Sequence, residues 1–316
     1  MINRFERVNP ETRQRVEAAI AEMGYQPNAI ARSMAQGRTN TLACLAPNLT
    51  DFTYANIIEG AEQEARQRGY FLLTASSPDQ EGFVSLVDQL LASRRAEGLV
   101  VITPFLDSYH TRLPRYVPAV YVSADPHLES ASSVMLDDKT AGAMATQHLI
   151  DLGHQEIAHI IGPLIEDCAR NRLLGYQTTL QAAGIQPNPQ LVAEGDWSAT
   201  SGYQIIRKLL ADRIHFSAIF AQNDRMAIGA IHALREAGKR VPQDVSVIGF
   251  DDMPLASYFD PPLTTIQQDT FRMGREAASL LIKAIERPEE VCQKVLIEAE
   301  LIVRQSTTRF NQKQGG

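Results

Sequence analysis

The chain has little of what stabilises or anchors proteins outside the cell. Only three of its 316 residues are cysteines, and Cys44, Cys168 and Cys292 lie far apart. Their spacing fits neither a disulfide framework nor a zinc site, so reduced thiols and a cytoplasmic location are expected. No apolar run reaches the ~18 residues of a membrane span. Residues 1–7 lack the apolar segment of a signal peptide, which argues against secretion.

The short motifs that mark common enzyme classes are also missing. There is no G-x-G-x-x-G, P-loop, G-x-S-x-G or H-E-x-x-H, and the seven histidines are scattered. Asp137-Asp138 and Asp251-Asp252 could be interpreted as catalytic carboxylates, but no serine or cysteine nucleophile is paired with a base. We therefore expect a binding protein rather than an enzyme, with no cofactor and no metal.

Charge is unevenly distributed along the chain. The net charge is −7, yet residues 1–40 hold six Lys and Arg against four Asp and Glu, a net +2 that leaves −9 for the rest. An acidic body behind a mildly basic arm is typical of a protein whose body stays off DNA. The 44% hydrophobic content is enough for a sizeable core.

Two helices are predicted before the body begins. Asn9, Pro10 and Gly24 are start and stop signals for a helix over 9–23, whose apolar face has nothing to pack against within residues 1–24. That helix either docks on the body or belongs to a larger helical domain. A second, short helix over 28–36 is too short to be stable alone, so it forms only when packed against something. The alternative is a plain linker.

From Thr41 onwards, apolar strands alternate with amphipathic helices, which predicts parallel sheets covered on both faces. The run is too long for one sheet, so the α/β body should have two lobes, with a crossing near 141–153. Residues 263–268 and a helix over 270–285 look like the return to the first lobe. The predicted strands are 41–46, 70–75, 98–102, 118–122, 157–161, 216–221 and 245–250. The predicted helices of the body are 54–68, 80–94, 138–152, 168–183, 199–211 and 223–237.

Polar side chains follow several of these strands. In open parallel sheets ligands bind beyond the carboxyl ends of strands, where Asp137, Asn223 and Asp251 are expected, with Arg172 in a nearby helix and Trp197 as the only tryptophan. An aromatic face with fixed donors and acceptors is typical of a sugar site.

Each of these residues has a simpler interpretation. Asp137 could cap the helix that follows it, and for Asp224 capping is the interpretation we favour. Asp252 is expected to be a turn residue. Trp197 could belong to the core, and Arg172 could pair with Asp167 or Glu166 on the surface.

The segment YQPNAIARSMAQGRTNTLACLAPN at residues 25–48 resembles the hinge helix and first core strand of the LacI/GalR family of bacterial transcription regulators. The resemblance covers nearly the whole chain. It implies a two-lobed, periplasmic-binding-protein-like fold, a homodimer, and a repressor whose affinity for operator DNA is controlled by a small-molecule effector, here a mono- or disaccharide. No leucine-heptad tail for a tetramer is present.

The resemblance also implies domain boundaries. Residues 1–26 would be part of the helix-turn-helix headpiece, 27–40 the hinge helix and linker, 41–311 the effector-binding core and 312–316 a tail. Within the core, lobe 1 would comprise about 41–138 and 269–298, and lobe 2 about 139–268 and 299–311. INRFERVNPETRQRV resembles the segment that follows the recognition helix of the family, so the chain as given is expected to bind DNA weakly and with little base selectivity.

The family's functional positions map onto residues of this chain. Met34 would wedge between base steps in the minor groove, and the other residues implied to contact DNA are Asn3, Tyr25, Asn28, Ala31, Arg32 and Ala35. The segment GDWSATSGY at 195–203 resembles sugar-binding members, in which the residues matching Arg172, Trp197, Asn223 and Asp251 contact the ligand. Gln268 matches a glutamine near the same pocket, and Phe52 and Tyr54 could wall it from lobe 1.

Two other functions share this core. One is a sugar-sensing core without DNA binding of its own, and the other is a sugar transport binding protein. The hinge-like segment and the expected lack of a signal peptide argue against the transport protein.

Overall fold

The computed structural model describes residues 9–24, 38–77, 80–93, 95–102, 117–124, 131–289 and 292–311. The chain divides into two compact units, Met1–Asn40 and Thr41–Gly316. The residues predicted to contact DNA lie outside the described part, namely Asn3, Tyr25, Asn28, Ala31, Arg32, Met34 and Ala35. The predicted hinge helix and its boundaries therefore stay predictions.

The first unit contains helix α1 (Pro10–Met23), and its predicted start and end are confirmed. The Asn9 side chain accepts a hydrogen bond from the Glu11 amide at 3.0 Å. Gly24 ends the helix in the left-handed region at φ +57°, which glycine adopts without steric cost. No residue of α1 is buried among the described residues, so its apolar face is uncovered there.

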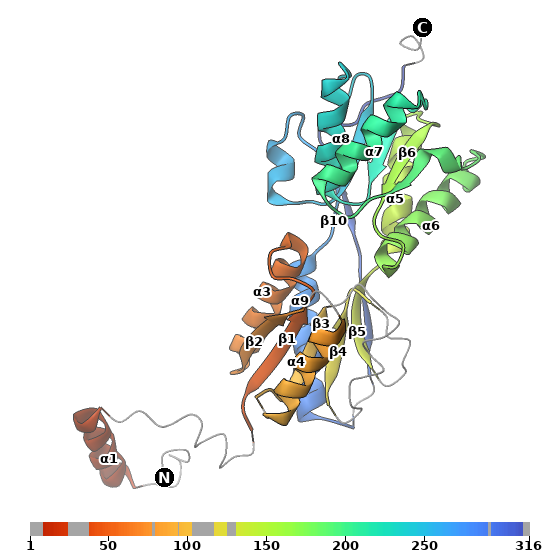
Figure 1. The fold of residues 1–316 in the computed structure, drawn as a ribbon. Helices are drawn as coiled ribbons and strands as arrows, with labels where there is room; N and C mark the ends of the chain where they lie inside the picture. The colour runs from red at the N-terminus through yellow and green to blue at the C-terminus, as the bar shows by residue number, and fades with distance from the viewer. Residues whose placement is uncertain are drawn as a thin grey trace. The chain divides into compact units, whose positions relative to one another are not determined.

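The second unit is built on two six-stranded sheets (Figure 1). The sheet of lobe 1 has the order β11-β5-β4-β3-β1-β2, and all its pairings are parallel. Its strands are β1 (Thr41–Ala46), β2 (Phe71–Ser76), β3 (Gly98–Ile102), β4 (Ala119–Val122), β5 (Ser132–Leu136) and β11 (Lys294–Ile297). Its helices are α3 (Phe52–Gln67), α4 (Gln80–Ala92) and α9 (Thr270–Glu286).

The sheet of lobe 2 has the order β12-β10-β9-β8-β6-β7, with one antiparallel pair, β10–β12. Its strands are β6 (Ile157–Ile161), β7 (Val192–Glu194), β8 (Ala218–Ala221), β9 (Ser246–Asp251), β10 (Thr264–Gln267) and β12 (Glu300–Ile302). Its helices are α5 (Asp138–Asp151), α6 (Asp167–Ala182), α7 (Ala199–Ala211), α8 (Asp224–Glu236) and the 3-10 turns η3 (Pro189–Leu191) and η4 (Pro254–Tyr258).

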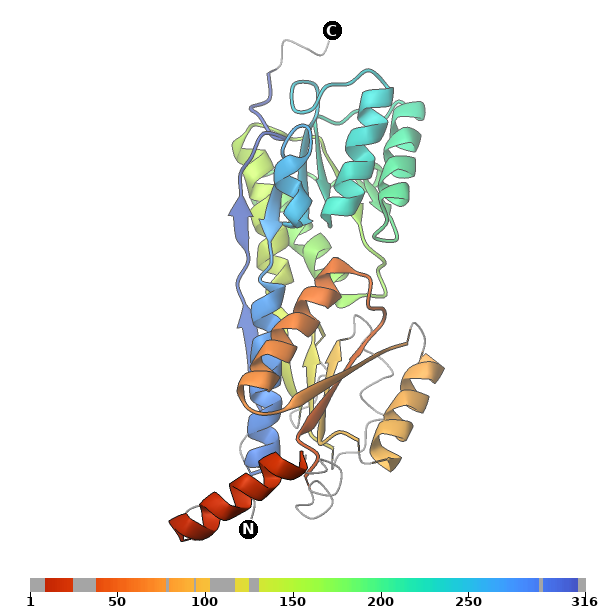
Figure 2. The same ribbon diagram turned by 90° about the vertical axis from the view of Figure 1, so that its left-hand side faces the viewer.

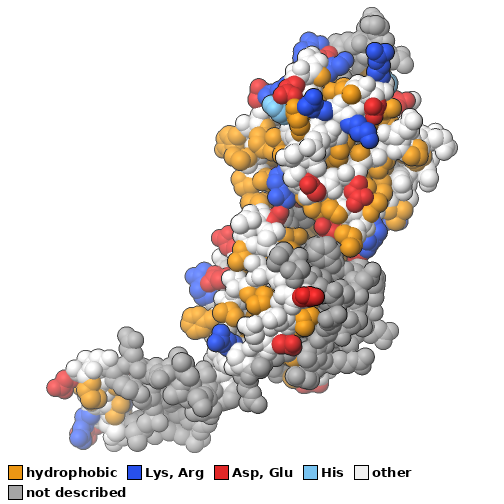
Figure 3. Space-filling view, in the orientation of Figure 1, with side chains coloured by type: hydrophobic (Ala, Val, Ile, Leu, Met, Phe, Trp, Pro, Cys, Tyr) orange, Lys and Arg blue, Asp and Glu red, His pale blue; other side chains and the backbone are white. Residues whose placement is uncertain are grey.

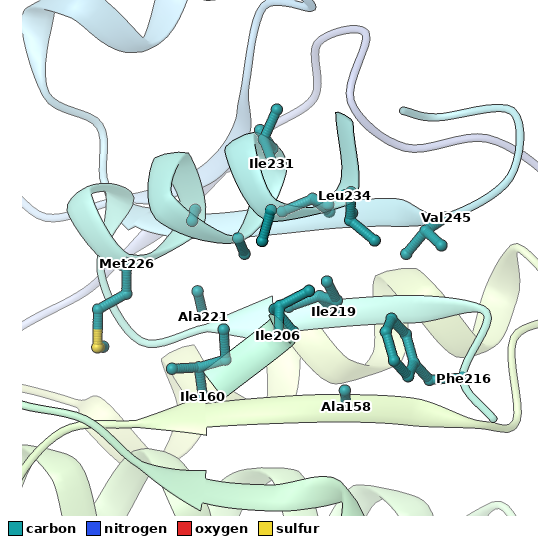
Figure 4. Close-up of a cluster of buried hydrophobic side chains, with 14 of the residues drawn as sticks. Ala158, Ile160, Ile206, Phe216, Ile219, Ala221, Met226, Ile231, Leu234 and Val245 are labelled. Carbon is teal, nitrogen blue, oxygen red and sulfur yellow. The ribbon is translucent and has the colours of Figure 1, made fainter. Parts of the chain in front are cut away.

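Each central strand is buried on both faces, as the apolar runs predict. On one side of the lobe 2 sheet, β6 and β8 pack against α7 and α8; Ile160, Ile206 and Leu234 meet there (Figure 4). On the other side, Tyr176 of α6 and Leu149 of α5 cover the same strands. The predicted α/β fold with two parallel sheets flanked by helices is confirmed.

Three chain segments connect the lobes: β5 leads into α5, β10 into α9, and β11 into β12. Figure 2 shows the last of these as the blue strands that continue from one lobe to the other. The Asp137 amide donates to the Ile297 carbonyl at 3.1 Å and so ties the first connection to the third. The cleft between the lobes lies where these connections pass.

Several predicted details differ from the structure. Residues 264–267, which by pattern looked like part of the return to lobe 1, pair with β9 of the lobe 2 sheet, on the lobe 2 side of the proposed boundary near residue 268. The strands β5, β7, β10, β11 and β12 are absent from the predicted strands; β7 and β12 have only three residues each, too few for a periodic pattern. In the described part of the chain, no helix is both long and apolar enough to cross a membrane.

Candidate ligand-binding cleft

A cleft between the lobes gathers most of the residues predicted to bind ligand. The space between its lining residues is ≈ 610 Å³, a volume that includes open solvent. Its lining comes from strand ends and helix starts of both lobes: Asp51, Thr53, Tyr54, Ser123, Leu136, Asp138, Glu166, Cys168, Arg172, Trp197, Asn223, Arg225, Asp251, Gln268 and Met273.

Arg172 is held in the cleft wall by contacts with the protein. It is 5% exposed, its Nε donates to Asp138 Oδ1 at 2.7 Å and its Nη1 donates to the Gln222 carbonyl at 2.7 Å. Its guanidinium carbon lies 3.6 Å from the centre of the Phe250 ring. The surface pairing that we left open for Arg172 is wrong, since Asp167 pairs with Arg170 instead.

The packing of α5 on α6 determines where Arg172 lies. A Cβ on Gly142 of α5 would lie 2.5 Å from the Arg172 carbonyl oxygen, so only glycine allows this approach. Burial raises the pKa of Asp138, while the adjacent Arg172 charge lowers it in part. The pair is therefore a buried ion pair in which each charge needs its partner.

Trp197 is fixed by three contacts in the loop between β7 and α7. Its Nε1 donates to Glu166 Oε1 at 3.0 Å, and its carbonyl accepts from Asn223 Nδ2 at 3.0 Å. One face of the ring covers Gly162, where an added Cβ would lie 2.1 Å from two ring carbons. The backbone at Trp197 has φ +67°, a conformation that is retained mainly where function requires it. The ring also packs on the lobe 2 core, so Trp197 belongs to both core and cleft.

Asn223 lines the cleft as predicted and also takes the capping role that was predicted for Asp224. Asn223, not Asp224, caps α8, and its Oδ1 accepts from the Met226 amide at 2.8 Å. Asp224 is fully buried and accepts from Thr265 Oγ1 at 2.6 Å and from the Met253 amide at 2.8 Å. Burial raises the pKa of Asp224 to about 7. Asp224 thereby ties together the ends of β9 and β10 behind the cleft.

Asp251 ends β9 at the cleft in a left-handed backbone conformation, φ +112°. Its Oδ1 accepts from Gln268 Nε2 at 2.6 Å. Burial raises the pKa of Asp251 well above the usual range, and the charge of Asp224 raises it further. Strained backbone with a displaced pKa at a cleft is a combination found at functional sites.

Two predicted ligand-binding residues do not line the cleft. Asp138 lines it instead of Asp137, whose carboxylate accepts from the Thr140 amide as the cap of α5. Tyr54 lines it, but Phe52 does not. Asp137 uses its side chain as the cap of a helix whose start was predicted correctly, whereas Phe52 misses the cleft because α3 begins two residues earlier than predicted.

Sequence reasoning also missed an ion pair that joins the lobes across the cleft. Asp51 caps α3 with Oδ1, which accepts from the Thr53 amide at 2.9 Å. Its Oδ2 lies 2.6 Å from Arg225 Nη2 of α8. Asp51 would have been a candidate as a helix cap, but its partner is 174 residues away in sequence.

Comparisons with known proteins decide the family. Residues 146–307 match the model of the periplasmic binding protein-like domain. The chain is 33% identical over 319 residues to the HTH-type transcriptional repressor PurR of Haemophilus influenzae (strain PittEE), covering 97% of this chain and 93% of that repressor. This chain belongs to the LacI/GalR family of transcriptional regulators. The predicted family is thus confirmed. The relative named here is a transcriptional repressor rather than an enzyme.

Solved structures of family members agree with the fold. A lac repressor dimer bound to operator and the anti-inducer ONPF has a TM-score of 0.89 at 31% identity, covering 97% of this chain and 93% of that one. A complex of the transcriptional regulator CelR with cellobiose has a TM-score of 0.80 at 34% identity, covering 96% and 93%. The predicted periplasmic-binding-protein-like fold is confirmed by these likenesses.

Proposed function

We propose that this regulator is a repressor that binds a mono- or disaccharide between its lobes. The observation that carries the proposal is the fixed Trp197 ring beside the Arg172 guanidinium, 5.9 Å from the ring centre, in a cleft that also contains Asp251 and Asn223. The C–H face of a sugar ring stacks on an aromatic face, and its hydroxyls both donate and accept hydrogen bonds. The CelR complex contains cellobiose, which supports a saccharide here.

The protein acts by binding and not by catalysis. Cys168 is the cleft residue most suited to nucleophilic attack, yet burial raises the pKa of its thiol, which opposes formation of the reactive thiolate. We assign its action to the cytoplasm, because operator DNA lies there.

Effector binding would reach the DNA through the lobes. A ligand in contact with Tyr54 of lobe 1 and Trp197 of lobe 2 favours one angle between the lobes, and β1 of lobe 1 directly follows the hinge segment 27–40. The spacing of two hinge helices in a dimer would change with that angle, and with it the contacts of Met34, Asn28, Ala31 and Arg32 in the minor groove. Asn3, Tyr25 and Ala35 would contact the DNA nearby.

The effector is tested by calorimetric titration with a panel of mono- and disaccharides. At least one sugar should bind. Trp197→Ala should lower the affinity for that sugar about tenfold or more, since the stacking face is lost. Tyr258→Ala is the matched control, because Tyr258 is 84% exposed and lies outside the cleft lining. If only purines or amino acids bind, or if Trp197→Ala binds the sugar like wild type, the proposed effector site is wrong.

We also propose a homodimer, as in the lac repressor–operator complex. On the edge strand β2, Phe71 is 76% exposed and Leu73 is 39% exposed, and an apolar sheet edge is a surface that a partner normally covers. Sedimentation at micromolar concentration should show a dimer, and Phe71→Glu should shift it to monomer. A wild-type monomer under these conditions would contradict the proposal.

Acidic and basic side chains are interspersed over the described part of lobe 2 on the face in Figure 3, so that face has no extended basic surface for DNA.

A further inference from the structure

The charges in the cleft do not balance. Two arginines and four carboxylates line it. Arg172 is paired with Asp138 and Arg225 with Asp51, so both cations are already used by carboxylates. Glu166 and Asp251 remain, and within the described part of the chain neither forms an ion pair.

Glu166 is the more unusual of the two carboxylates. It is 7% exposed, and a carboxylate at that depth normally has a cation or several strong donors. Its Oε1 accepts from Trp197 Nε1 at 3.0 Å, and its Oε2 has only the Cys168 thiol, a weak donor, at 3.7 Å. Burial raises the pKa of Glu166; the two hydrogen bonds and the charge of Arg172, which forms no ion pair with Glu166, oppose that rise.

The position of Glu166 is suited to a cation on the ligand. The carboxylate accepts a hydrogen bond from the edge of the indole on which we place the sugar ring, and we place a substituent at the rim of that sugar beside Oε2. An ammonium group there gains a charge-assisted hydrogen bond from Glu166 and the attraction of the indole ring. An anionic substituent would meet the Glu166 carboxylate, while each arginine already has a carboxylate partner.

We infer that the cleft selects an amino sugar, with Glu166 as the residue that recognises its ammonium group, and that it rejects sugar phosphates and sugar acids. This inference rests on the proposed saccharide site and specifies the chemical class of its ligand. The uncompensated carboxylate beside the stacking tryptophan is the juxtaposition that carries it.

The experiment compares matched sugars on the full chain by calorimetry at pH 7 and low salt. The probes are glucose, glucosamine, N-acetylglucosamine and glucose 6-phosphate, with galactose and galactosamine as a second pair. In at least one pair the amino sugar should bind about tenfold more tightly than its neutral parent, because a hydrogen bond to a charged group is stronger. The N-acetyl sugar should lose this advantage, and the phosphate should bind more weakly than the neutral sugar.

Glu166→Gln is the decisive variant, because the amide oxygen can still accept from Trp197 Nε1 while the charge is lost. It should abolish the preference for the amino sugar, measured as the ratio of the two dissociation constants within the variant, so that any general change in sugar affinity cancels; an unchanged emission spectrum of Trp197 would show that the ring has not moved. If wild type has no preference for the amino sugar, or if Glu166→Gln keeps it, the inference is wrong. If Asp251→Asn abolishes the preference instead, the assignment to Glu166 is wrong.

Neutral sugars that bind without any preference for amines overturn only this inference, whereas no binding of any sugar overturns the proposed function as well.

Discussion

Replacing Arg172 with alanine is expected to lower the free energy of unfolding by about 3–5 kcal/mol. The Arg172 and Asp138 side chains are only 6% and 12% exposed, so the substitution leaves a buried carboxylate without its cation. The Gln222 carbonyl loses its donor at the same time. Urea denaturation of the variant and of wild type measures the difference.

Two further variants separate the ion pair from general effects. Arg170→Ala breaks the ion pair between Arg170, whose side chain is 45% exposed, and Asp167. It should lower the free energy of unfolding by less than about 1 kcal/mol. Arg172→Met combined with Asp138→Leu should recover much of the lost stability, because an apolar pair can replace a buried ion pair. It should not recover sugar binding. Equal stability of Arg172→Ala and Arg170→Ala would show that the buried pair has no special role.

Gly162→Ala should disable the cleft without unfolding lobe 2. The new Cβ would lie 2.1 Å from two carbons of the Trp197 ring, so the indole must swing away and lose its hydrogen bond to Glu166. We expect sugar affinity to fall by about 30- to 1000-fold, from the lost stacking and the lost hydrogen bond to a charged group. Because Trp197 is the only tryptophan, its emission should shift to the red as the ring gains contact with water.

Gly238→Ala is the matched glycine control. Gly238 has φ +72° and no atom within 4 Å of an added Cβ, so the substitution should cost about 1 kcal/mol of stability through backbone strain alone. Its emission spectrum and sugar affinity should equal those of wild type. If Gly162→Ala also keeps the wild-type emission and affinity, Gly162 does not position the ring.

Much of the fold and part of the cleft could be predicted from local pattern. Apolar runs alternating with amphipathic helices indicate parallel sheets, and helix caps such as Asn9 are short-range signals. Arg172, Trp197, Asn223 and Asp251 could be placed near one site because the carboxyl ends of parallel strands share one edge of a sheet, whereas Gln268 was placed there only by the family resemblance. These inferences need only the order of elements and not their exact packing.

The tertiary structure decided which side chains face the cleft and which partners they have. Successive residues on a helix point about 100° apart, so Asp138 rather than Asp137, and Tyr54 rather than Phe52, lines it once the helix starts are fixed. The partners of Arg172 and Trp197 are 34 and 31 residues away along the chain. No local pattern specifies such pairs, because they form only when helices from different βα units pack together. The lack of an ion-pair partner for Glu166 is likewise a property of the whole cleft, since it depends on which carboxylates form ion pairs with the two arginines.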